Sequence, residues 1–410
     1  MLCSSAGVVQ ARLHIPPARA ALALSLLLGL QPVTTDVYLP ALPMLRRALA
    51  APMGQAQLTM SALILAFGLA QMVWGPVADR TGRRPVLLAG LALYTLAAAG
   101  CALASDMGQL VAWRVVQGAA LAAGVVCARA IVRDLYEPVE GARMMTLALS
   151  GLGLIALLGP ALGGLAAQAF GWRGPLVLVA AVGAATLAFV AARLPETLPA
   201  RERSAAKRAA LWPTWWAIAR HPAFVAWALL VACTYGGLFT LLASSSFVFM
   251  DVLGFAPAAY GAAMALGSLS YIAGTFVCRR WIARHGLAGA VSRGGWFTLA
   301  GGLTMALPAA LGVQSAWAVS GGYMLYAFGH GMHQPCGQAG VVAPFPRSAG
   351  AASALAGLLL ALVAFGVGLW LGGALDGSVR PLAYGLAFWS LLTCGVAWTL
   401  VQRQARAGAR

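Results

Sequence analysis

The sequence predicts an all-α membrane protein of twelve transmembrane helices, and its composition, its apolar segments and the positions of its arginines support this fold class. Of the 410 residues, 61% are hydrophobic and only 9% are charged, whereas soluble domains carry about 25% charged residues. A helix that spans a membrane needs roughly 20 mostly apolar residues. Segments of this kind lie at 18–41, 56–78, 85–104, 109–132, 143–168, 174–194, 221–247, 257–278, 289–310, 315–337, 350–374 and 382–403.

The positive charges predict the orientation of these helices. When residue 1 is placed in the cytoplasm, 21 of the 27 Lys and Arg residues fall in cytoplasmic segments; the others are Arg46, Arg47, Arg114, Arg129, Arg173 and Arg380. Lys and Arg are retained on the cytoplasmic side of membranes, so we expect both termini there. The net charge of +17 is spread over span ends and is not gathered on one face. This favours contact with the lipid bilayer over nucleic-acid binding.

A polar interval after the sixth predicted span divides the chain. Residues 195–220 contain the charged residues Arg201, Glu202, Arg203, Lys207 and Arg208. We therefore expect a six-helix half at 1–194, a cytoplasmic linker at 195–220 and a second six-helix half at 221–410.

The segment between the second and third predicted spans has the composition of a tight, charged hairpin. Residues 75–85 read Gly-Pro-Val-Ala-Asp-Arg-Thr-Gly-Arg-Arg-Pro and lie between two long apolar runs. Glycines permit close backbone approach and tight turning, and arginines suit the level of the lipid headgroups. The residues expected to act in this hairpin are Gly75, Asp79, Arg80, Gly82, Arg83 and Arg84.

The spacing G-x-x-x-D-R-x-G-R-R in this hairpin resembles the loop between the second and third helices of major facilitator superfamily (MFS) transporters. Residues 129–136 and 251–254, with the Thr-Asp-Val-Tyr-Leu-Pro run that starts at residue 35, look like the Bcr/CflA drug-resistance branch. The helix-5 segment resembles the end of the antiporter motif G-x-x-x-G-P-x-x-G-G, although Ile155 replaces its first glycine. The other matching segments are Arg114-x-x-Gln117-Gly118, Gly159-Pro160-x-x-Gly163-Gly164 and Leu194-Pro195-Glu196-Thr197.

This resemblance implies the MFS fold, with two six-helix halves around a central cavity, and a drug:proton antiporter that works by alternating access. It implies small lipophilic or cationic drug-like substrates, protons as the second partner, the proton gradient in place of a cofactor, and a bacterial-type inner membrane. We expect a monomer. The conformational switch would comprise the hairpin together with Gly159, Pro160, Gly163 and Gly164. The alternative is an MFS symporter or facilitator for a single metabolite.

Sequence motifs of enzymes and metal sites are missing. The chain has no P-loop, no H-E-x-x-H, no G-x-S-x-G and no nucleotide fingerprint, so we expect no enzyme. It has seven cysteines but no C-x-x-C pair, so neither a disulfide framework nor a structural zinc site is predicted.

Asp36 is the candidate proton-coupling residue, because it is the only acidic residue placed in the hydrocarbon region. A charge there costs at least roughly 2–3 kcal/mol, so such a residue normally faces a cavity, pairs with a cation or exchanges a proton. We expect Arg114 to be its partner, because both residues should lie in the outer half of the membrane. Asp36 is roughly 27 Å along an outward-running helix at 1.5 Å per residue, and Arg114 is near the start of an inward-running helix. The alternatives are that Asp36 caps a break before Pro40 and that Arg114 reaches the outer headgroups.

Aromatic and polar residues in the spans are candidates for a substrate cavity, because aromatic side chains suit lipophilic or cationic compounds. His330, His333 and Cys336 recur at intervals of three on one predicted helix. That pattern admits cavity lining, helix packing or metal handling, and a metal would need more convergent ligands. The candidate cavity residues are Tyr38, Gln117, Tyr235, Phe239, His330 and His333, with Phe247, Phe249, Tyr271 and Trp296 as further aromatic candidates.

Overall fold

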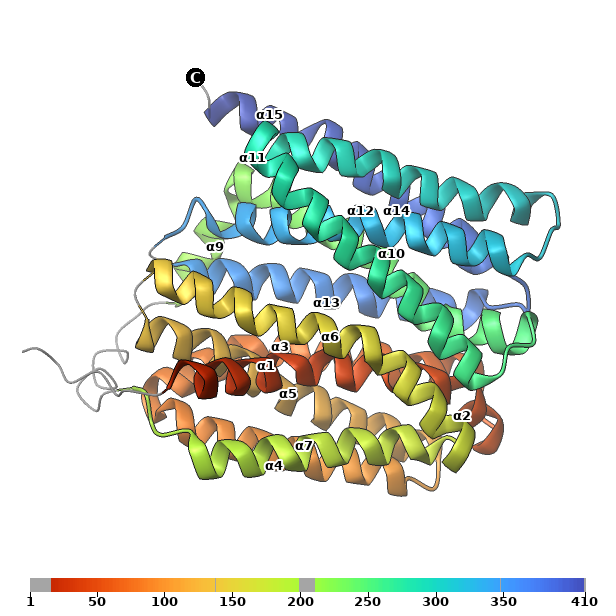
Figure 1. Cartoon of the computed structure of the whole chain (residues 1–410), viewed down its shortest axis with the longest axis horizontal. Coiled ribbons are helices and arrows are strands. Elements are labelled where there is room, and N and C mark those ends of the chain that lie inside the picture. The colour runs from red at the N-terminus through yellow and green to blue at the C-terminus, as the bar shows by residue number, and fades with distance from the viewer. Residues whose placement is uncertain (1–15, 137, 199–210, 347, 409–410) are drawn as a thin grey trace, which may run out of the picture.

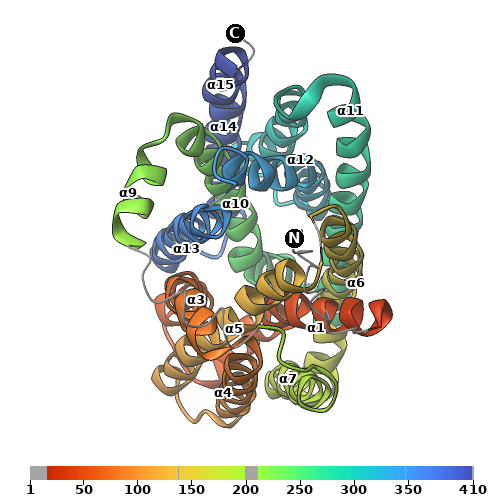
Figure 2. The ribbon, with the colours of Figure 1, turned by 90° about the vertical axis from the view of Figure 1, so that its left-hand side faces the viewer.

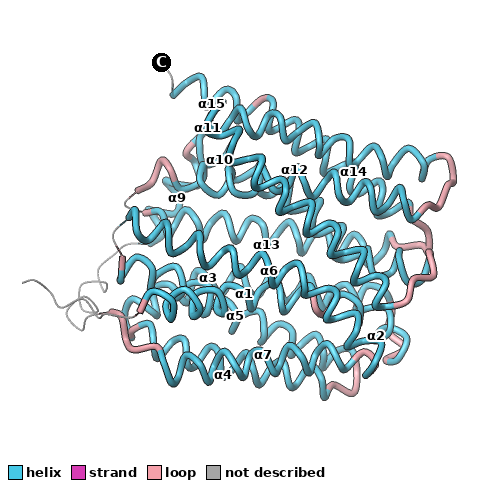
Figure 3. The backbone as a smooth tube through the Cα atoms, in the orientation of Figure 1, coloured by secondary structure: helices cyan, strands magenta, loops and turns pink. Residues whose placement is uncertain are grey.

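The chain folds into a bundle of long helices that run roughly along one direction (Figure 1). The computed structural model describes residues 16–136, 138–198, 211–346 and 348–408. All the regular structure in this described part is helical (Figure 3). Large apolar side chains cover much of the outside; Trp317 and Leu103, for example, are 89% and 79% exposed. Such a surface suits lipid rather than water, and helices satisfy their own backbone hydrogen bonds in lipid.

The elements before residue 194 begin with a helix that changes geometry at prolines. Pro40 and Pro43 lack a backbone N–H, and the first predicted span, 18–41, accordingly runs from an α-helix into a 3₁₀ turn, after which a second short helix follows. The elements are α1 (Pro17–Asp36), η1 (Leu39–Ala41), α2 (Leu42–Ala48), α3 (Met53–Thr81), α4 (Arg83–Leu103), α5 (Met107–Leu135), α6 (Pro138–Phe170) and α7 (Arg173–Arg193).

The elements after residue 211 include one long helix that contains two spans. Gly286 has φ 69° and ψ 178° inside it, a conformation that glycine adopts readily, and the predicted spans 257–278 and 289–310 lie on either side of this break. The elements are α9 (Leu211–Arg220), α10 (Pro222–Phe247), η3 (Val248–Val252), α11 (Pro257–Ala310), α12 (Ala316–Val342), α13 (Ala349–Ala374), α14 (Arg380–Trp398) and α15 (Leu400–Gly408).

The structure confirms the prediction of an all-helical fold with twelve membrane spans. Nine helices of the described part are long and apolar enough to cross a membrane. One of these is α11, which Gly286 divides in two. The helices α6 and α12, of 33 and 27 residues, are also long enough to span, and they cover the remaining two predicted segments.

The elements before residue 194 meet those after residue 211 along two seams (Figure 2). Helix α3 packs against α13, and α6 packs against α11. Glycines bring these helices close: a Cβ at Gly68 would overlap Ala361, and a Cβ at Gly164 would overlap the carbonyl oxygen of Pro257. The seams therefore depend on small residues at the contact points.

We name the two ends of the bundle after residues that lie there. The Asp79 end carries the turn between α3 and α4, together with α9 and the described C-terminus, and the Arg47 end carries α2 (Figure 1).

The predicted linker at 195–220 differs from the structure at residues 211–220, which form the helix α9. Trp215 and Ile218 lie three residues apart on this helix and are half-buried and buried. The charged residues at 201–208 lie outside the described residues, so the division into halves at 195–220 stays a prediction.

Candidate functional site

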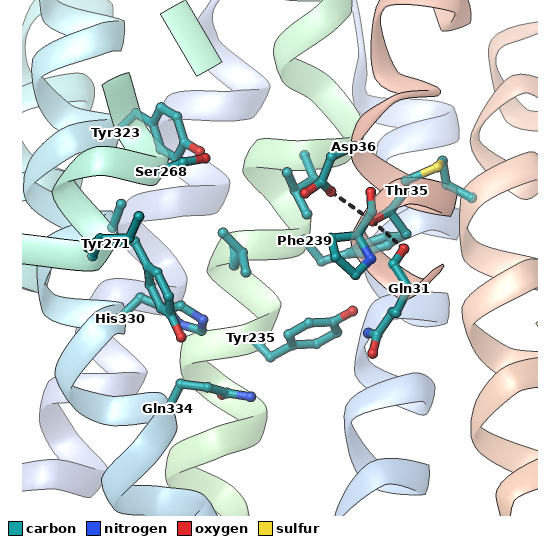
Figure 4. Close-up of a pocket in the computed structure, with 17 residues that line it drawn as sticks. Gln31, Thr35, Asp36, Tyr235, Phe239, Ser268, Tyr271, Tyr323, His330 and Gln334 are labelled. Atoms are coloured by element: carbon teal, nitrogen blue, oxygen red, sulfur yellow. Dashed lines mark hydrogen bonds between the residues drawn. The ribbon is translucent and has the colours of Figure 1, made fainter. Parts of the chain in front are cut away.

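A cavity of about 250 Å³ lies between α1, α10, α11 and α12. Figure 4 shows Asp36 and Gln31 of α1 facing Tyr271, Tyr323 and His330 across this central cavity. Its walls are mostly aromatic and aliphatic, with a few polar groups at defined positions, as is typical of ligand pockets. The lining residues are Gln31, Pro32, Thr35, Asp36, Met60, Tyr235, Leu238, Phe239, Leu242, Gly267, Ser268, Tyr271, Ile272, Tyr323, Ala327, His330 and Gln334.

Asp36 is the acidic residue of the central cavity. It is the last residue of α1 and is half-buried. The hydroxyl of Thr35 donates a hydrogen bond of 2.7 Å to its Oδ1, and none of the ion pairs found in the described residues includes it. Gly159 of α6 lies against Asp36, since a Cβ there would be 3.4 Å from the Asp36 Cβ. The carboxyl group is therefore held among apolar and aromatic side chains with one hydroxyl donor.

Arg114 is fully buried in α5 and bonds to groups other than Asp36. Its Nε donates to the carbonyl oxygen of Thr59 at 3.2 Å, and its Nη1 donates to the carbonyl oxygen of Thr34 at 3.3 Å and to Gln117 Oε1 at 2.9 Å. The structure therefore corrects the expected direct pairing of Asp36 with Arg114. Arg114 does lie at the level of the end of α1 that carries Asp36. However, the group of α1 that contacts its guanidinium is the backbone carbonyl of Thr34 and not the Asp36 side chain.

Two predicted cavity residues surround Arg114 and do not line the central cavity. The guanidinium carbon lies 3.9 Å from the centre of the Tyr38 ring, a cation–π contact, and the Tyr38 hydroxyl donates to Thr59 Oγ1 at 2.9 Å. Gln117 is also fully buried. The charge of a buried cation must be compensated; Gln117 accepts a hydrogen bond from the guanidinium, and the Tyr38 ring lies against it.

The two histidines of α12 face different neighbours. His330 lines the central cavity, and its Nδ1 lies 2.9 Å from the hydroxyl of Thr234. His333 is buried away from the cavity, with Nε2 3.1 Å from the carbonyl oxygen of Val291. The sulfur of Cys336 lies 3.4 Å from that of Cys278. His333 and Cys336 thus take part in helix packing, and the described residues contain no group of three or more potential metal ligands.

The aromatic candidates divide into cavity residues and packing residues. Tyr235, Phe239 and Tyr271 line the central cavity as expected. Phe247 and Phe249 are buried elsewhere, and Trp296 is 64% exposed on the outside of the bundle. Helix faces decide this division, because only residues on the inward-facing side of a helix reach the cavity.

Sequence reasoning missed Gln31, Ser268, Tyr323 and Gln334 of the cavity. On α12 the lining residues are Tyr323, Ala327, His330 and Gln334, which recur at the four- and three-residue spacing of one helix face. His333, three residues after His330, does not lie on this face, whereas Gln334, four residues after His330, does. The four-residue spacing from His330 would therefore have predicted Gln334 as a cavity residue.

The Asp79 end is held by a network of charges. Gly82, with φ 109°, is the single residue between α3 and α4. Arg83 is buried and donates to Asp79 Oδ1 at 2.6 Å and to Asp134 Oδ2 at 2.9 Å. The carboxylate of Glu196 accepts hydrogen bonds from the backbone N–H groups of Arg83 and Arg84. It thereby satisfies two free N–H groups at the start of α4 and complements the helix dipole.

The remaining residues of the predicted switch lie at contact points. Arg80 is exposed and Gly75 is half-buried at the Asp79 end. A Cβ at Gly163 of α6 would overlap the carbonyl oxygen of Val37. A Cβ at Gly261 of α11 would overlap the carbonyl oxygen of Pro160 of α6. The motif at 159–164 therefore joins α6 to α1 on one side and to α11 on the other.

Two further cavities connect the central cavity with the Asp79 end. A chamber of about 110 Å³ shares Gln31, Tyr235 and Gln334 with the central cavity. A vestibule of about 600 Å³, which reaches Asp79, shares Gln71, Arg129 and Ser353 with that chamber.

At the Arg47 end, by contrast, the elements before residue 194 bond to those after residue 211. Gln57 Nε2 donates to the carbonyl oxygen of Ala243 at 2.8 Å, and Arg47 pairs with Asp251 at 2.9 Å. The cavities thus lead from the central cavity toward the Asp79 end.

Comparison with known proteins gives a match along most of the chain. The family model described as Major Facilitator Superfamily matches residues 24–368. The MFS-type transporter YdgK of Bacillus subtilis (strain 168) is 31% identical over 66% of this chain and 68% of its own length. Multidrug resistance protein D of Escherichia coli (strain K12) is 29% identical over 82% of this chain and 84% of its own. These relatives confirm the resemblance drawn from the hairpin motif, and none of them is named as an enzyme.

Solved structures share the fold at low sequence identity. A bacterial homologue of the human lysosomal transporter Spinster, in an inward-facing and unoccupied conformation, superimposes with a TM-score of 0.72 at 15% identity, over 94% of this chain and 97% of its own. The human organic anion transporter MFSD10 (TETRAN) gives 0.66 at 21% identity, over 94% of this chain and all of its own.

Proposed function

Because the chain belongs to the Major Facilitator Superfamily, we propose that it is a proton-coupled exporter of small drug-like compounds. In this proposal it exchanges drug for protons by alternating access, as a monomer in a bacterial inner membrane. The Asp79 end is cytoplasmic, since most Lys and Arg residues belong to segments that lie on that side.

The carboxyl group of Asp36 carries this proposal. It lies on the wall of the central cavity, where no cation pairs with it among the described residues. An ionisable group at such a position is by default a candidate for proton transfer. Exchange requires that drug and proton favour opposite states, because a ligand shifts an equilibrium only by binding one state better.

The cavities support a state that is open toward the cytoplasm. They lead from Asp36 to the vestibule at Asp79, while Arg47–Asp251 and Gln57–Ala243 hold the opposite end together. In the other state these outer contacts separate and the seams at the Asp79 end close. The hairpin and the 159–164 motif act in this exchange and not in substrate choice.

The substrate class rests on the cavity walls and on the relatives. Tyr235, Phe239, Tyr271 and Tyr323 offer ring faces and edges to a lipophilic or cationic compound. Two relatives are named multidrug resistance protein D and bicyclomycin resistance protein homolog; the latter, from Haemophilus influenzae, is 25% identical over 65% of this chain and 67% of its own length. Export of drug-like compounds is the activity that fits both observations.

Proton movement in inside-out membrane vesicles tests this proposal. Respiration acidifies the vesicle lumen, which a pH-sensitive dye reports, and candidate drugs are then added outside. An antiporter releases protons from the lumen when drug enters, so the dye signal reverses. A symporter moves protons with its substrate into the lumen, and a facilitator leaves the signal unchanged; either result contradicts the proposal.

A further inference from the structure

Arg129 of α5 places a positive charge inside the transport route. Its side chain is exposed to the vestibule and to the connecting chamber, both of which it lines. It lies six residues before the end of α5 at Leu135, and because it lines both spaces, its guanidinium faces the interior of the protein and not the lipid headgroups. The anchoring role common to arginines at span ends does not account for this placement.

The guanidinium has more donors than the protein uses. Arg129 Nη1 donates to the hydroxyl of Ser353 at 3.0 Å, whereas a guanidinium has five N–H donors. No ion pair to Arg129 occurs within the described residues. Asp79 also lines the vestibule, but Arg83 holds its carboxylate at 2.6 Å. A cleft lined by one sign of charge attracts ligands of the opposite sign, and the described protein supplies no anionic partner for Arg129.

The connecting chamber offers neutral polar groups beside this charge. The carbonyl oxygen of the Gln334 side chain is buried without a hydrogen-bond partner in the described part of the chain, and a rotation of that amide would present its NH₂ group instead. Gly357 leaves room for the Gln71 amide, whose nitrogen would lie 3.2 Å from a Cβ at that position. No acidic residue is among the described residues that line the chamber. The polar lining residues are Gln31, Gln71, Arg129, Tyr235, Gln334, Gln338 and Ser353.

We propose that this chamber binds the anionic group of a substrate through Arg129, so that the transporter accepts carboxylate-bearing and zwitterionic compounds. The inference rests on the proposed export function and names a substrate class for it. Arg129 provides a bidentate site for a carboxylate, the glutamine amides donate to the same group, and the rest of the molecule lies against the tyrosines of the central cavity. Because the chamber and the central cavity share Gln31, Tyr235 and Gln334, one compound can occupy both.

Binding of a matched pair of compounds to the purified full-length protein in lipid nanodiscs tests the proposal. Norfloxacin carries a carboxylate and an amine, and its methyl ester retains only the amine. By titration calorimetry, the wild type should bind norfloxacin about tenfold more tightly than the ester, since hydrogen bonds to charged groups are the stronger ones. Arg129→Gln should remove this preference and leave ester binding within about twofold. Arg403→Gln, the same change at an exposed site of α15, should keep the preference.

A second variant retains Arg129 and supplies an internal competitor. Ser353→Asp places a carboxylate where the hydroxyl contacts the guanidinium, so it should weaken norfloxacin binding about tenfold and spare the ester; Ser353→Asn should weaken neither. The proposal is overturned if the wild type binds the two compounds equally or binds neither. It is also overturned if Arg129→Gln and Ser353→Asp weaken the binding of both compounds equally. Proton release driven by the ester would still support the export function in that case. A preserved carboxylate preference without any drug-driven proton movement would instead refute the export function alone.

Discussion

Arg114 donates to the backbone carbonyl of Thr34, two residues before Asp36, at 3.3 Å. The last carbonyl groups of a helix lack intrahelical partners, and α1 ends at Asp36. Arg114 thus satisfies a carbonyl at this end, where a cation is also favoured by the helix dipole. The link between the two predicted coupling residues therefore passes through the backbone of α1, and a movement of Arg114 relative to α5 would shift the segment that carries Asp36.

Arg114→Lys should therefore lower both stability and coupling. Lysine keeps the charge but lacks the planar fork of donors, so the carbonyl group of Thr34 at the end of α1 loses its partner, at about 1–3 kcal/mol for a buried group left unsatisfied. A fall in melting temperature in detergent, with the exposed Arg403→Lys as control, checks this effect.

A double-mutant cycle of Arg114→Gln and Asp36→Asn on drug binding should be non-additive. Purely additive losses would mean that the two sites are uncoupled.

Asp79→Asn should slow the transport of every substrate by a similar factor. The Asp79 carboxylate shares Arg83 with Asp134, and the network lies at the Asp79 end, away from the central cavity. Loss of one partner of the buried Arg83 alters the relative free energies of the two states and not the contacts to drug. Initial rates for several drugs, normalised to the amount of folded protein, measure the effect. Selective loss of one drug with normal rates for others would indicate a binding role for Asp79.

Gly163→Ala should impair transport more than an alanine at an unconstrained glycine. Its Cβ would overlap the carbonyl oxygen of Val37, a backbone atom that cannot move aside cheaply, whereas Gly366 has open space around it. The α1–α6 contact would then be pushed apart near Asp36. Transport rates of Gly163→Ala and Gly366→Ala in matched vesicles make the comparison, and equal rates would show that the close contact at Gly163 is dispensable.

The orientation in the membrane is tested with reporter fusions. A fusion at residue 205 should read as cytoplasmic and fusions at residues 48 and 314 as external, because arginine and lysine are concentrated on the side of residue 205. An external reading at residue 205 would overturn the orientation on which the proposed direction of transport depends.

Sequence reasoning located the helices and the depth of key residues but not the directions of their side chains. Apolar length predicts a span, and a lone acid in such a span predicts a cavity; both hold for α1 and Asp36. Rotation about a helix axis is set by packing, so equal depth did not imply that Arg114 faces Asp36. The same limit applies to His333, which lies beside His330 in sequence but packs against Val291. Arg129 was noted within a predicted span but not as a site residue, because its place beside the chamber depends on α13, which brings Ser353 to it.

Drug-driven proton movement by the Asp36→Asn variant tests the central claim most directly. The variant and the wild type are reconstituted into proteoliposomes, and drug uptake is followed together with internal pH across a range of external pH values. We predict that Asp36→Asn binds drug and remains folded but no longer moves protons with it, so that its uptake ceases to depend on the proton gradient. Unchanged, pH-dependent exchange of drug for protons in this variant would contradict the assignment of Asp36 as the coupling residue.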